Sequence, residues 1–287
     1  RLASVKYRVP RTGERLMKKE KPKFRLPRPD EVNEPPKNIL QYCITIFGEK
    51  GVGKTSLAAQ FPNAVVGMTE PRRRNLRIRM VSLDKDWNYT KEFVDACIED
   101  DSVETVVIDT IDRVYAQCLA SICFDKGIKD PGQMNDYGAT WREIKDEFER
   151  TFNSVLYAEK GLVFLSHAQH RDMEMRTGET RSLLVPTCSP AAFNYIKAVA
   201  DYAFYYGYHG MNRALYLRGH EDLWTGCGSS DHFCDPEGNP VRTILLGDTP
   251  EEAYQTFIQS FDNNVWDVDR KEEEKPTKKK KLKIPVS

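Results

Sequence analysis

The chain has 287 residues, of which 40% are hydrophobic, so it is long enough to bury one sizeable core. No apolar run approaches the roughly 18 residues of a membrane-spanning helix, and no apolar segment with a cleavage site follows the basic N-terminal residues, so we expect a soluble cytoplasmic protein without membrane contact. The formal net charge is zero, but the charges are unevenly distributed.

The two ends of the chain are basic and the middle is acidic. Residues 1–40 hold 12 Lys and Arg against 5 Asp and Glu, residues 270–287 hold 8 against 3, and those between hold 23 against 35. Basic tails are typical of polyanion binding, of simple solvation or, for the KKKKLK run, of a localisation signal. We expect a basic arm or linker over 1–38 and a disordered basic tail over 266–287, with nucleic-acid contact by at least one of them.

Seven scattered cysteines, an odd number, favour free thiols in a reducing compartment over a disulfide framework. Cys227, His232 and Cys234 would supply three zinc ligands. Their spacing matches no zinc finger or ribbon, and a fourth ligand is not evident. The sequence therefore gives zinc binding little support.

The folded domain is expected over residues 39–265. Buried strands are indicated by short runs rich in β-branched and aromatic residues, at 39–47, 64–68, 105–110 and 161–167. Helices are indicated by apolar residues at intervals of three and four, at 112–127 and 141–161, with a further helix beginning at Thr55. This alternation predicts an α/β fold with a mostly parallel, doubly wound sheet.

The pattern changes after Ala200. Two alternating segments surround a Gly-Met-Asn turn within residues 201–219, and a third follows at 241–247. We expect antiparallel strands here that close one edge of the sheet. A final helix is expected over 250–262.

A glycine-rich loop follows the first strand and precedes a helix. Gly48-x-x-x-x-Gly53-Lys54-Thr55 matches all positions of the phosphate-binding loop, the P-loop, in the order strand, loop, helix that this motif requires. Backbone N–H groups of such a loop bind phosphates, Lys54 reaches the β- and γ-phosphates, and Thr55 ligates Mg²⁺. The sequence predicts ATP and Mg²⁺ as cofactors, held by Gly48, Glu49, Lys50, Gly51, Val52, Gly53, Lys54, Thr55 and Ser56.

A second magnesium group is expected from a carboxylate at the end of a neighbouring apolar strand. Asp109, in TVVIDT, has this position. The alternative is a helix cap, since DTIDR leads into a helix, but Asp112 is the better candidate for that role.

Hydrolysis also requires a group that polarises the attacking water. Glu70 is the leading candidate because it follows the strand at 64–68, which we expect beside the P-loop, whereas Asp84 and Asp86 lie in a more polar stretch. An exposed loop glutamate is the alternative. Ser166 and His167 end the strand at 161–167, where a polar side chain would contact the γ-phosphate; a buried structural histidine is equally compatible.

These motifs, over about residues 40–262, resemble the phage-encoded RecA-like nucleotide-binding proteins, which include the Sak-type single-strand annealing ATPases. The likeness rests on GEKGVGKTSLAAQFPNA, the strand ending TEP, VVIDTID, DYGATWREIKDEF, GLVFLSH and the late strand pair ending ALYLRG. The resemblance implies a RecA-like P-loop ATPase that binds ATP at a subunit boundary, assembles as a ring or filament, and handles single-stranded DNA in recombination or annealing. A phage-encoded member would act in the host cell cytoplasm.

The resemblance also implies roles for individual residues. Glu70 corresponds to the catalytic glutamate and His167 to the γ-phosphate sensor, while Arg218, or Arg213, would reach the nucleotide of a neighbouring subunit. Residues 125–138 correspond to the first DNA-binding loop and residues 168–186 to the second. The DNA-contact candidates in the second loop are His170, Arg171, Arg176 and Arg181.

Two features depart from the family pattern: the basic arm, which would contact DNA, a subunit or a single-strand-binding or replication partner, and the arginine-rich run at 72–79. P-loop domains serve many reactions, so the DNA-binding role rests on the resemblance. The alternatives are another P-loop motor or loader, helicase-like or packaging-associated, and a nucleotide-gated oligomeric scaffold.

Overall fold

A computed structural model of the chain describes residues 26–70, 75–175, 177–227 and 231–268. The chain divides into two units, Arg1–Glu34 and Pro35–Ser287. In the first unit, the Arg28 backbone N–H donates to the Glu31 carboxylate across a turn. The predicted disorder of the two tails falls largely on residues 1–25 and 269–287, which lie outside the described part of the chain.

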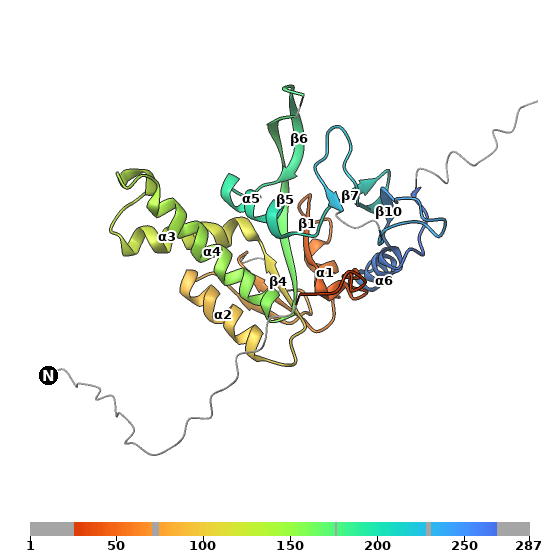
Figure 1. Ribbon diagram of the computed structural model, residues 1–287, viewed down its shortest axis with the longest axis horizontal. Coiled ribbons are helices and arrows are strands. Elements are labelled where there is room, and N and C mark those ends of the chain that lie inside the picture. The colour runs from red at the N-terminus through yellow and green to blue at the C-terminus, as the bar shows by residue number, and fades with distance from the viewer. Residues whose placement is uncertain (1–25, 71–74, 176, 228–230, 269–287) are drawn as a thin grey trace, which may run out of the picture. The chain divides into compact units, whose positions relative to one another are not determined.

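The second unit is built on one large sheet (Figure 1). Within the described residues the strands are β1 Cys43–Gly48, β2 Ala64–Met68, β3 Met80–Ser82, β4 Thr105–Asp109, β5 Gly161–Glu174, β6 Thr180–Pro186, β7 Tyr202–His209, β8 Asn212–Tyr216, β9 Gly226–Cys227 and β10 Thr243–Leu245. The helices are η1 Ile39–Gln41, α1 Lys54–Ala58, α2 Trp87–Glu99, α3 Ile111–Asp125, η2 Pro131–Gln133, α4 Ala139–Tyr157, α5 Pro190–Val199 and α6 Pro250–Phe261.

The order of the strands in the sheet is β10-β8-β7-β1-β5-β4-β2-β3. The six strands from β7 to β3 run parallel, because each is joined to the next by parallel pairing. Strands β8 and β10 add an antiparallel edge. The predicted α/β fold, with a mostly parallel doubly wound sheet and antiparallel edge strands, is confirmed.

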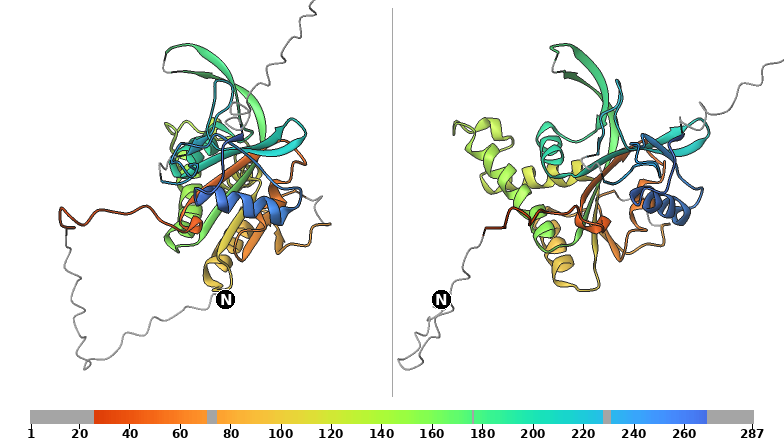
Figure 2. Two further views of the ribbon diagram at one scale, coloured as in Figure 1. Left: turned by 90° about the vertical axis from the view of Figure 1, so that its right-hand side faces the viewer. Right: turned by 45° about the vertical axis from the view of Figure 1, so that its right-hand side comes forward.

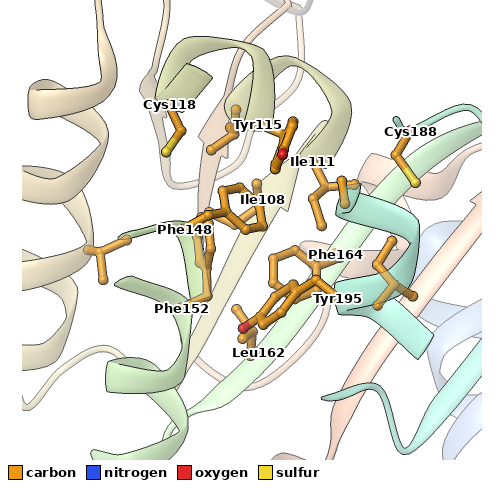
Figure 3. Close-up of a cluster of buried hydrophobic side chains, with 14 of the residues drawn as sticks. Ile108, Ile111, Tyr115, Cys118, Phe148, Phe152, Leu162, Phe164, Cys188 and Tyr195 are labelled. Carbon is orange, nitrogen blue, oxygen red and sulfur yellow. The ribbon is translucent and has the colours of Figure 1, made fainter. Parts of the chain in front are cut away.

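Alternate residues of the central strands face two separate cores. On one face, Phe164 and Ile108 pack against α3 and α4, where Phe148 and Phe152 lie fully buried (Figure 3). On the other face, Leu165 joins the core formed with α1 and α6. The side chains of a strand alternate between its two faces. Two consecutive residues at the end of a strand therefore point toward different layers of helices.

Several elements differ from the sequence-based expectation. Residues 39–41 form a 3₁₀ turn rather than strand, because the Asn38 side chain accepts from the Leu40 N–H. Elements β3, α2 and α5 were not predicted. Strand β5 continues to Glu174 and pairs with β6, so residues 168–186 form a β-hairpin rather than a loop. Figures 1 and 2 show this hairpin extending beyond the sheet.

None of the seven cysteines, all of which lie in the described ranges, forms a disulfide bond. Burial raises the pKa of the Cys118 and Cys188 thiols to about 12, so these thiols stay protonated and unreactive at neutral pH. Among the described residues, no group of three or more His, Cys, Asp and Glu side chains is arranged to hold a metal ion. The nitrogens Nδ1 and Nε2 of His232 instead lie 3.0 and 2.9 Å from the carbonyl oxygens of Phe261 and Pro36.

None of the helices in the described ranges combines the length and the apolar character needed to cross a membrane.

Gly48 ends β1 against the backbone of β7. A Cβ atom at this position would lie 2.0 Å from the Tyr206 carbonyl oxygen, and both groups belong to paired strands that cannot easily separate. We expect Gly48→Ala to lower the free energy of unfolding by about 3 kcal/mol, measured by urea denaturation.

Gly226→Ala is the matched control, because the nearest atom to its added Cβ would be 3.9 Å away. That variant is expected to change the free energy of unfolding by less than about 0.5 kcal/mol. Equal stability of the two variants would contradict the steric role of Gly48.

Candidate functional site

The P-loop connects β1 to α1. Its backbone has left-handed dihedral angles at Gly51 (φ +85°) and Gly53 (φ +116°), which residues with a Cβ rarely adopt. The Lys54 side chain is buried, and its Nζ donates to the carbonyl oxygens of Gly48 and Glu49 at 2.9 and 2.8 Å. The loop is therefore folded around its own lysine, which lies where a phosphate-binding cation is needed.

Thr55 and Asp109 meet beneath the loop. The Thr55 hydroxyl donates to Asp109 Oδ2 at 2.6 Å, and both residues are almost fully buried. Hydroxyl and carboxylate oxygens are ligands that Mg²⁺ prefers, so this pair fits a magnesium ion beside the P-loop. The strand of Asp109 was expected next to β1, which is wrong, because β5 lies between β1 and β4.

Glu70 and His167 come together from different strands. Glu70 Oε1 lies 2.9 Å from His167 Nε2, and because a carboxylate only accepts, Nε2 donates this hydrogen bond. His167 is paired with Gly48 in the sheet register, which places it at the start of the P-loop. The expectation that the strand of Glu70 lies beside the P-loop is wrong, since β4 and β5 separate β2 from β1. Glu70 approaches the loop through His167.

Two further contacts define the surroundings of this pair. His167 Nδ1 is buried and has no hydrogen-bond partner among the described residues. Thr69, next to Glu70, donates its hydroxyl to the Asp109 carbonyl oxygen at 3.1 Å and accepts from the Thr110 N–H at 3.0 Å. The chain before Glu70 is thus fixed to the end of β4, so the positions of Glu70 and Asp109 depend on each other.

Ser166 faces away from the P-loop and does not join His167 there, because adjacent strand residues point to opposite faces. Its hydroxyl donates to Asp112 Oδ1 at 3.0 Å and lies 3.2 Å from the Thr187 hydroxyl, which donates to Asp112 Oδ2 at 3.1 Å. Asp112 is therefore not the helix cap that was expected; Thr110 precedes α3 as its N-cap residue. No sequence signal pointed to Thr187.

The other carboxylates considered for water activation have different surroundings. Asp86 is the N-cap of α2, where its side chain accepts from the Tyr89 N–H at 2.9 Å. Asp84 is exposed and lines a cavity of about 440 Å³ with Thr69 and Arg113. Neither has a contact with the P-loop comparable to that of Glu70 through His167.

The two arginines considered for contact with a neighbouring subunit bind groups of their own chain. Arg213 Nη1 donates to the Asp248 carbonyl oxygen at 2.8 Å, and Arg218 Nη2 donates to the Phe233 carbonyl oxygen at 3.5 Å. Arg213 also lines a cavity with Gly53. Arg213 thus lies beside the P-loop of the same chain.

The DNA-contact candidates lie on the β5–β6 hairpin. Arg171 Nη2 donates to the Cys188 carbonyl oxygen at 2.7 Å, and its guanidinium lies over the Phe193 ring. Arg181 pairs with Glu179 at 3.1 Å, whereas His170 is exposed. Arg176 lies outside the described residues. Two of the four candidates therefore already contact other groups of the same chain.

The segment expected as the first DNA-binding loop joins α3 to α4. Within 125–138, Tyr137 is 97% exposed, and Phe124 just before it is 83% exposed. Residues 72–74 of the arginine-rich run lie outside the described part, while Arg79 donates to the Ser102 carbonyl oxygen at 3.2 Å. Large aromatic surfaces are therefore open to solvent at one end of the α3–α4 pair.

A protein-family model described as AAA domain matches residues 40–226. A search of curated proteins finds no match. Among solved structures, a KaiC-like protein from the hyperthermophilic archaeon Pyrococcus horikoshii is 12% identical, with a TM-score of 0.41 over 74% of this chain and 88% of that chain. The family match covers more than half of the chain, including the P-loop, Glu70, Asp109 and His167.

Proposed function

The chain belongs to the family of AAA domains. We propose that it binds ATP with Mg²⁺ and hydrolyses it while acting on single-stranded DNA in recombination or strand annealing. Its ATPase domain has a RecA-like P-loop fold. One observation carries the catalytic part of the proposal: two side-chain pairs, Thr55 with Asp109 at 2.6 Å and Glu70 with His167 at 2.9 Å, lie at the ends of the strands around the P-loop, which begins at Gly48 opposite His167.

Each of these side chains has a defined task in the proposed reaction. Lys54 gives its charge to the β- and γ-phosphate oxygens in place of the loop carbonyls it now contacts. Thr55 and Asp109 hold Mg²⁺, which neutralises phosphate charge when bound. Glu70 accepts a proton from, or orients, the attacking water, and His167 fixes the direction of the Glu70 carboxylate.

The DNA part of the proposal has separate support. The chain resembles the phage-encoded Sak-type annealing ATPases in the order of its motifs, and both of its ends are basic. Exposed aromatic side chains such as Phe124 and Tyr137 are of the kind on which bases stack without sequence preference. We further propose that the protein assembles into a ring or filament on the strand.

The ATPase rate with and without single-stranded DNA tests this proposal. Addition of DNA is expected to raise the rate, and the stimulation is expected to fall as salt concentration rises, because phosphate contacts release counterions. Lys54→Ala is the control, since it should remove turnover under both conditions. DNA binding that is absent, or that does not respond to salt, would rule out the DNA part while leaving ATP hydrolysis in place.

A nucleotide-gated scaffold is the second candidate. It is favoured by the contacts of Arg171 with the Cys188 carbonyl and of Arg181 with Glu179, since both guanidinium groups are engaged by protein rather than presented to a ligand. In this case ATP binding orders an oligomer and turnover is incidental. The Glu70 variant described in the Discussion separates the two functions.

A further inference from the structure

The P-loop carries a carboxylate of its own. Glu49 directly follows Gly48, the last residue of β1, and is exposed. The backbone N–H groups of a P-loop point at the phosphates of a nucleotide, so a negative charge on the loop that turns toward them opposes binding. The direction of the Glu49 side chain therefore affects how tightly the loop binds a polyphosphate.

Tyr205 of β7 holds this side chain. Its hydroxyl donates to Glu49 Oε1 at 3.4 Å, and within the described ranges no other group donates a hydrogen bond to the Glu49 carboxylate. Burial, together with the nearby Glu49 carboxylate, raises the pKa of Tyr205 to about 12. The hydroxyl thus keeps its proton at neutral pH and acts as the donor.

Three neighbours fix the direction of the Tyr205 ring. The ring packs against Phe47 and Tyr216, with centroid distances of 5.5 and 5.6 Å. A Cβ atom at Gly207, two residues further along β7, would lie 2.6 Å from Cε1 of the ring and 3.0 Å from its hydroxyl oxygen. Because Gly207 has no side chain, the ring has room to extend along β7 toward the P-loop.

The contact with Tyr205 keeps the carboxylate away from the catalytic side of the loop. Strand β1 lies between β7 and β5 (Figure 1). His167, Asp109 and Glu70 come from β5, β4 and the segment after β2, and all three strands lie on the side of β1 opposite to β7. A carboxylate held toward β7 is therefore held away from the side on which the γ-phosphate reacts.

Lys54 holds the backbone of the same residue. Lys54 Nζ donates to the Glu49 carbonyl oxygen at 2.8 Å. In the proposed function Lys54 contacts the phosphates when a nucleotide binds, so Glu49 then loses this donor. The hydrogen bond from Tyr205 remains, and it matters most in the nucleotide-bound state.

We propose that Tyr205 is a positioning residue for nucleotide binding, which holds the Glu49 carboxylate on the β7 side of the P-loop and away from the phosphates. The inference rests on the proposed binding of ATP at the P-loop. Tyr205 acts through Glu49 and does not itself contact the nucleotide. Without the hydroxyl, the carboxylate is free to turn toward the phosphates and to weaken their binding.

Dissociation constants for ATP in the presence of Mg²⁺, measured by competition against a fluorescent nucleotide, test this inference. Tyr205→Phe removes only the hydroxyl and should weaken ATP binding about fivefold. Glu49→Gln removes the charge and should tighten binding about twofold. In the double variant the hydroxyl has no charge left to hold, so ATP should bind as tightly as to Glu49→Gln, about tenfold more tightly than to Tyr205→Phe.

Salt separates this electrostatic role from a packing role. The ratio of the Tyr205→Phe and wild-type dissociation constants should fall toward one as sodium chloride is added, because ions screen the repulsion between the carboxylate and the phosphates. A loss of packing would not respond to salt in this way. Tyr216→Phe is the matched control: its ring packs against Tyr205, but its hydroxyl donates to the Tyr208 carbonyl oxygen at 2.9 Å, so ATP affinity should not change.

Glu49→Asp tests the same contact while the tyrosine is kept. The shorter side chain retains the charge but does not reach the hydroxyl, so ATP binding should weaken about threefold to fivefold. Thermal unfolding of each variant checks the fold, and Glu49→Asp keeps the test decisive if Tyr205→Phe does not fold. Unchanged ATP affinity in Tyr205→Phe or Glu49→Asp would overturn the inference, as would a double variant that binds ATP as weakly as Tyr205→Phe. If the wild-type protein does not bind ATP, the proposed ATP-binding function itself fails.

Discussion

Replacing Lys54 by alanine is expected to lower the ATP turnover rate at least about 100-fold. A preorganised charge beside the transferring phosphoryl group stabilises the negative charge that develops in the transition state. Loss of one such contact lowers the rate about 10²–10³-fold. Lys54 is 4% exposed, so water cannot readily replace its charge. Release of inorganic phosphate at saturating ATP measures the effect.

Lys145→Ala is the control for this experiment, because Lys145 lies on the exposed side of α4 and, within the described ranges, pairs only with Glu149 at 3.8 Å. Its turnover should equal that of the wild type. The Lys54 variant also loses the donor to the Gly48 and Glu49 carbonyls, so urea denaturation is needed to show that the domain remains folded. A folded Lys54→Ala protein with turnover within about twofold of wild type would contradict the phosphate role.

Glu70→Gln is expected to abolish most ATP hydrolysis while ATP binding remains. Glutamine keeps an oxygen that can accept from His167 Nε2, so the geometry at 2.9 Å should persist. It cannot take a proton from water, and loss of a general base usually lowers the rate about 10²–10⁴-fold. Single-turnover hydrolysis and equilibrium ATP binding measure the two properties separately.

The same variant separates the two proposed functions. If turnover drives a cycle on single-stranded DNA, the Glu70→Gln protein should bind ATP and DNA but fail to support strand annealing or recombination. A nucleotide-gated scaffold would keep its function without hydrolysis. Glu92→Gln is the matched control, because Glu92 is an exposed carboxylate on α2 and should leave hydrolysis unchanged. Loss of ATP binding along with hydrolysis would argue against a purely catalytic role for Glu70.

The buried strands were the most predictable part of the fold. Residues 64–68 and 105–109 are buried throughout, and a continuous apolar run is what a parallel strand covered on both faces requires. Strand β3 was not predicted because it has only three residues, none of them fully buried, which is too short for an alternation of apolar and polar residues to be recognised. Helix α5 had a recognisable start, since the Ser189 side chain accepts from the Ala192 N–H and Pro190 follows at the first helical position.

The site was predictable as a set of residue types but not as an arrangement. The P-loop pattern identified Lys54 and Thr55 because the spacing itself dictates a loop that cradles phosphate. The distance of Glu70 from that loop could not be predicted from the sequence. It depends on the strand order, in which β4 and β5 lie between β1 and β2. The contacts of Asp112 with Ser166 and Thr187 join residues far apart in sequence, and no local pattern encodes them.

Strand β5 belongs both to the central sheet and to the hairpin, and this has a mechanical consequence. From His167, which contacts Glu70, the strand runs without interruption to Glu174. Seven residues of strand at about 3.3 Å each make a lever arm of about 23 Å, so a tilt of about 5° at His167 would move the far end of the arm by about 2 Å. A tilt too small to disturb the packing around the nucleotide would thus move the far end of β5 far enough to break a contact with a partner bound there.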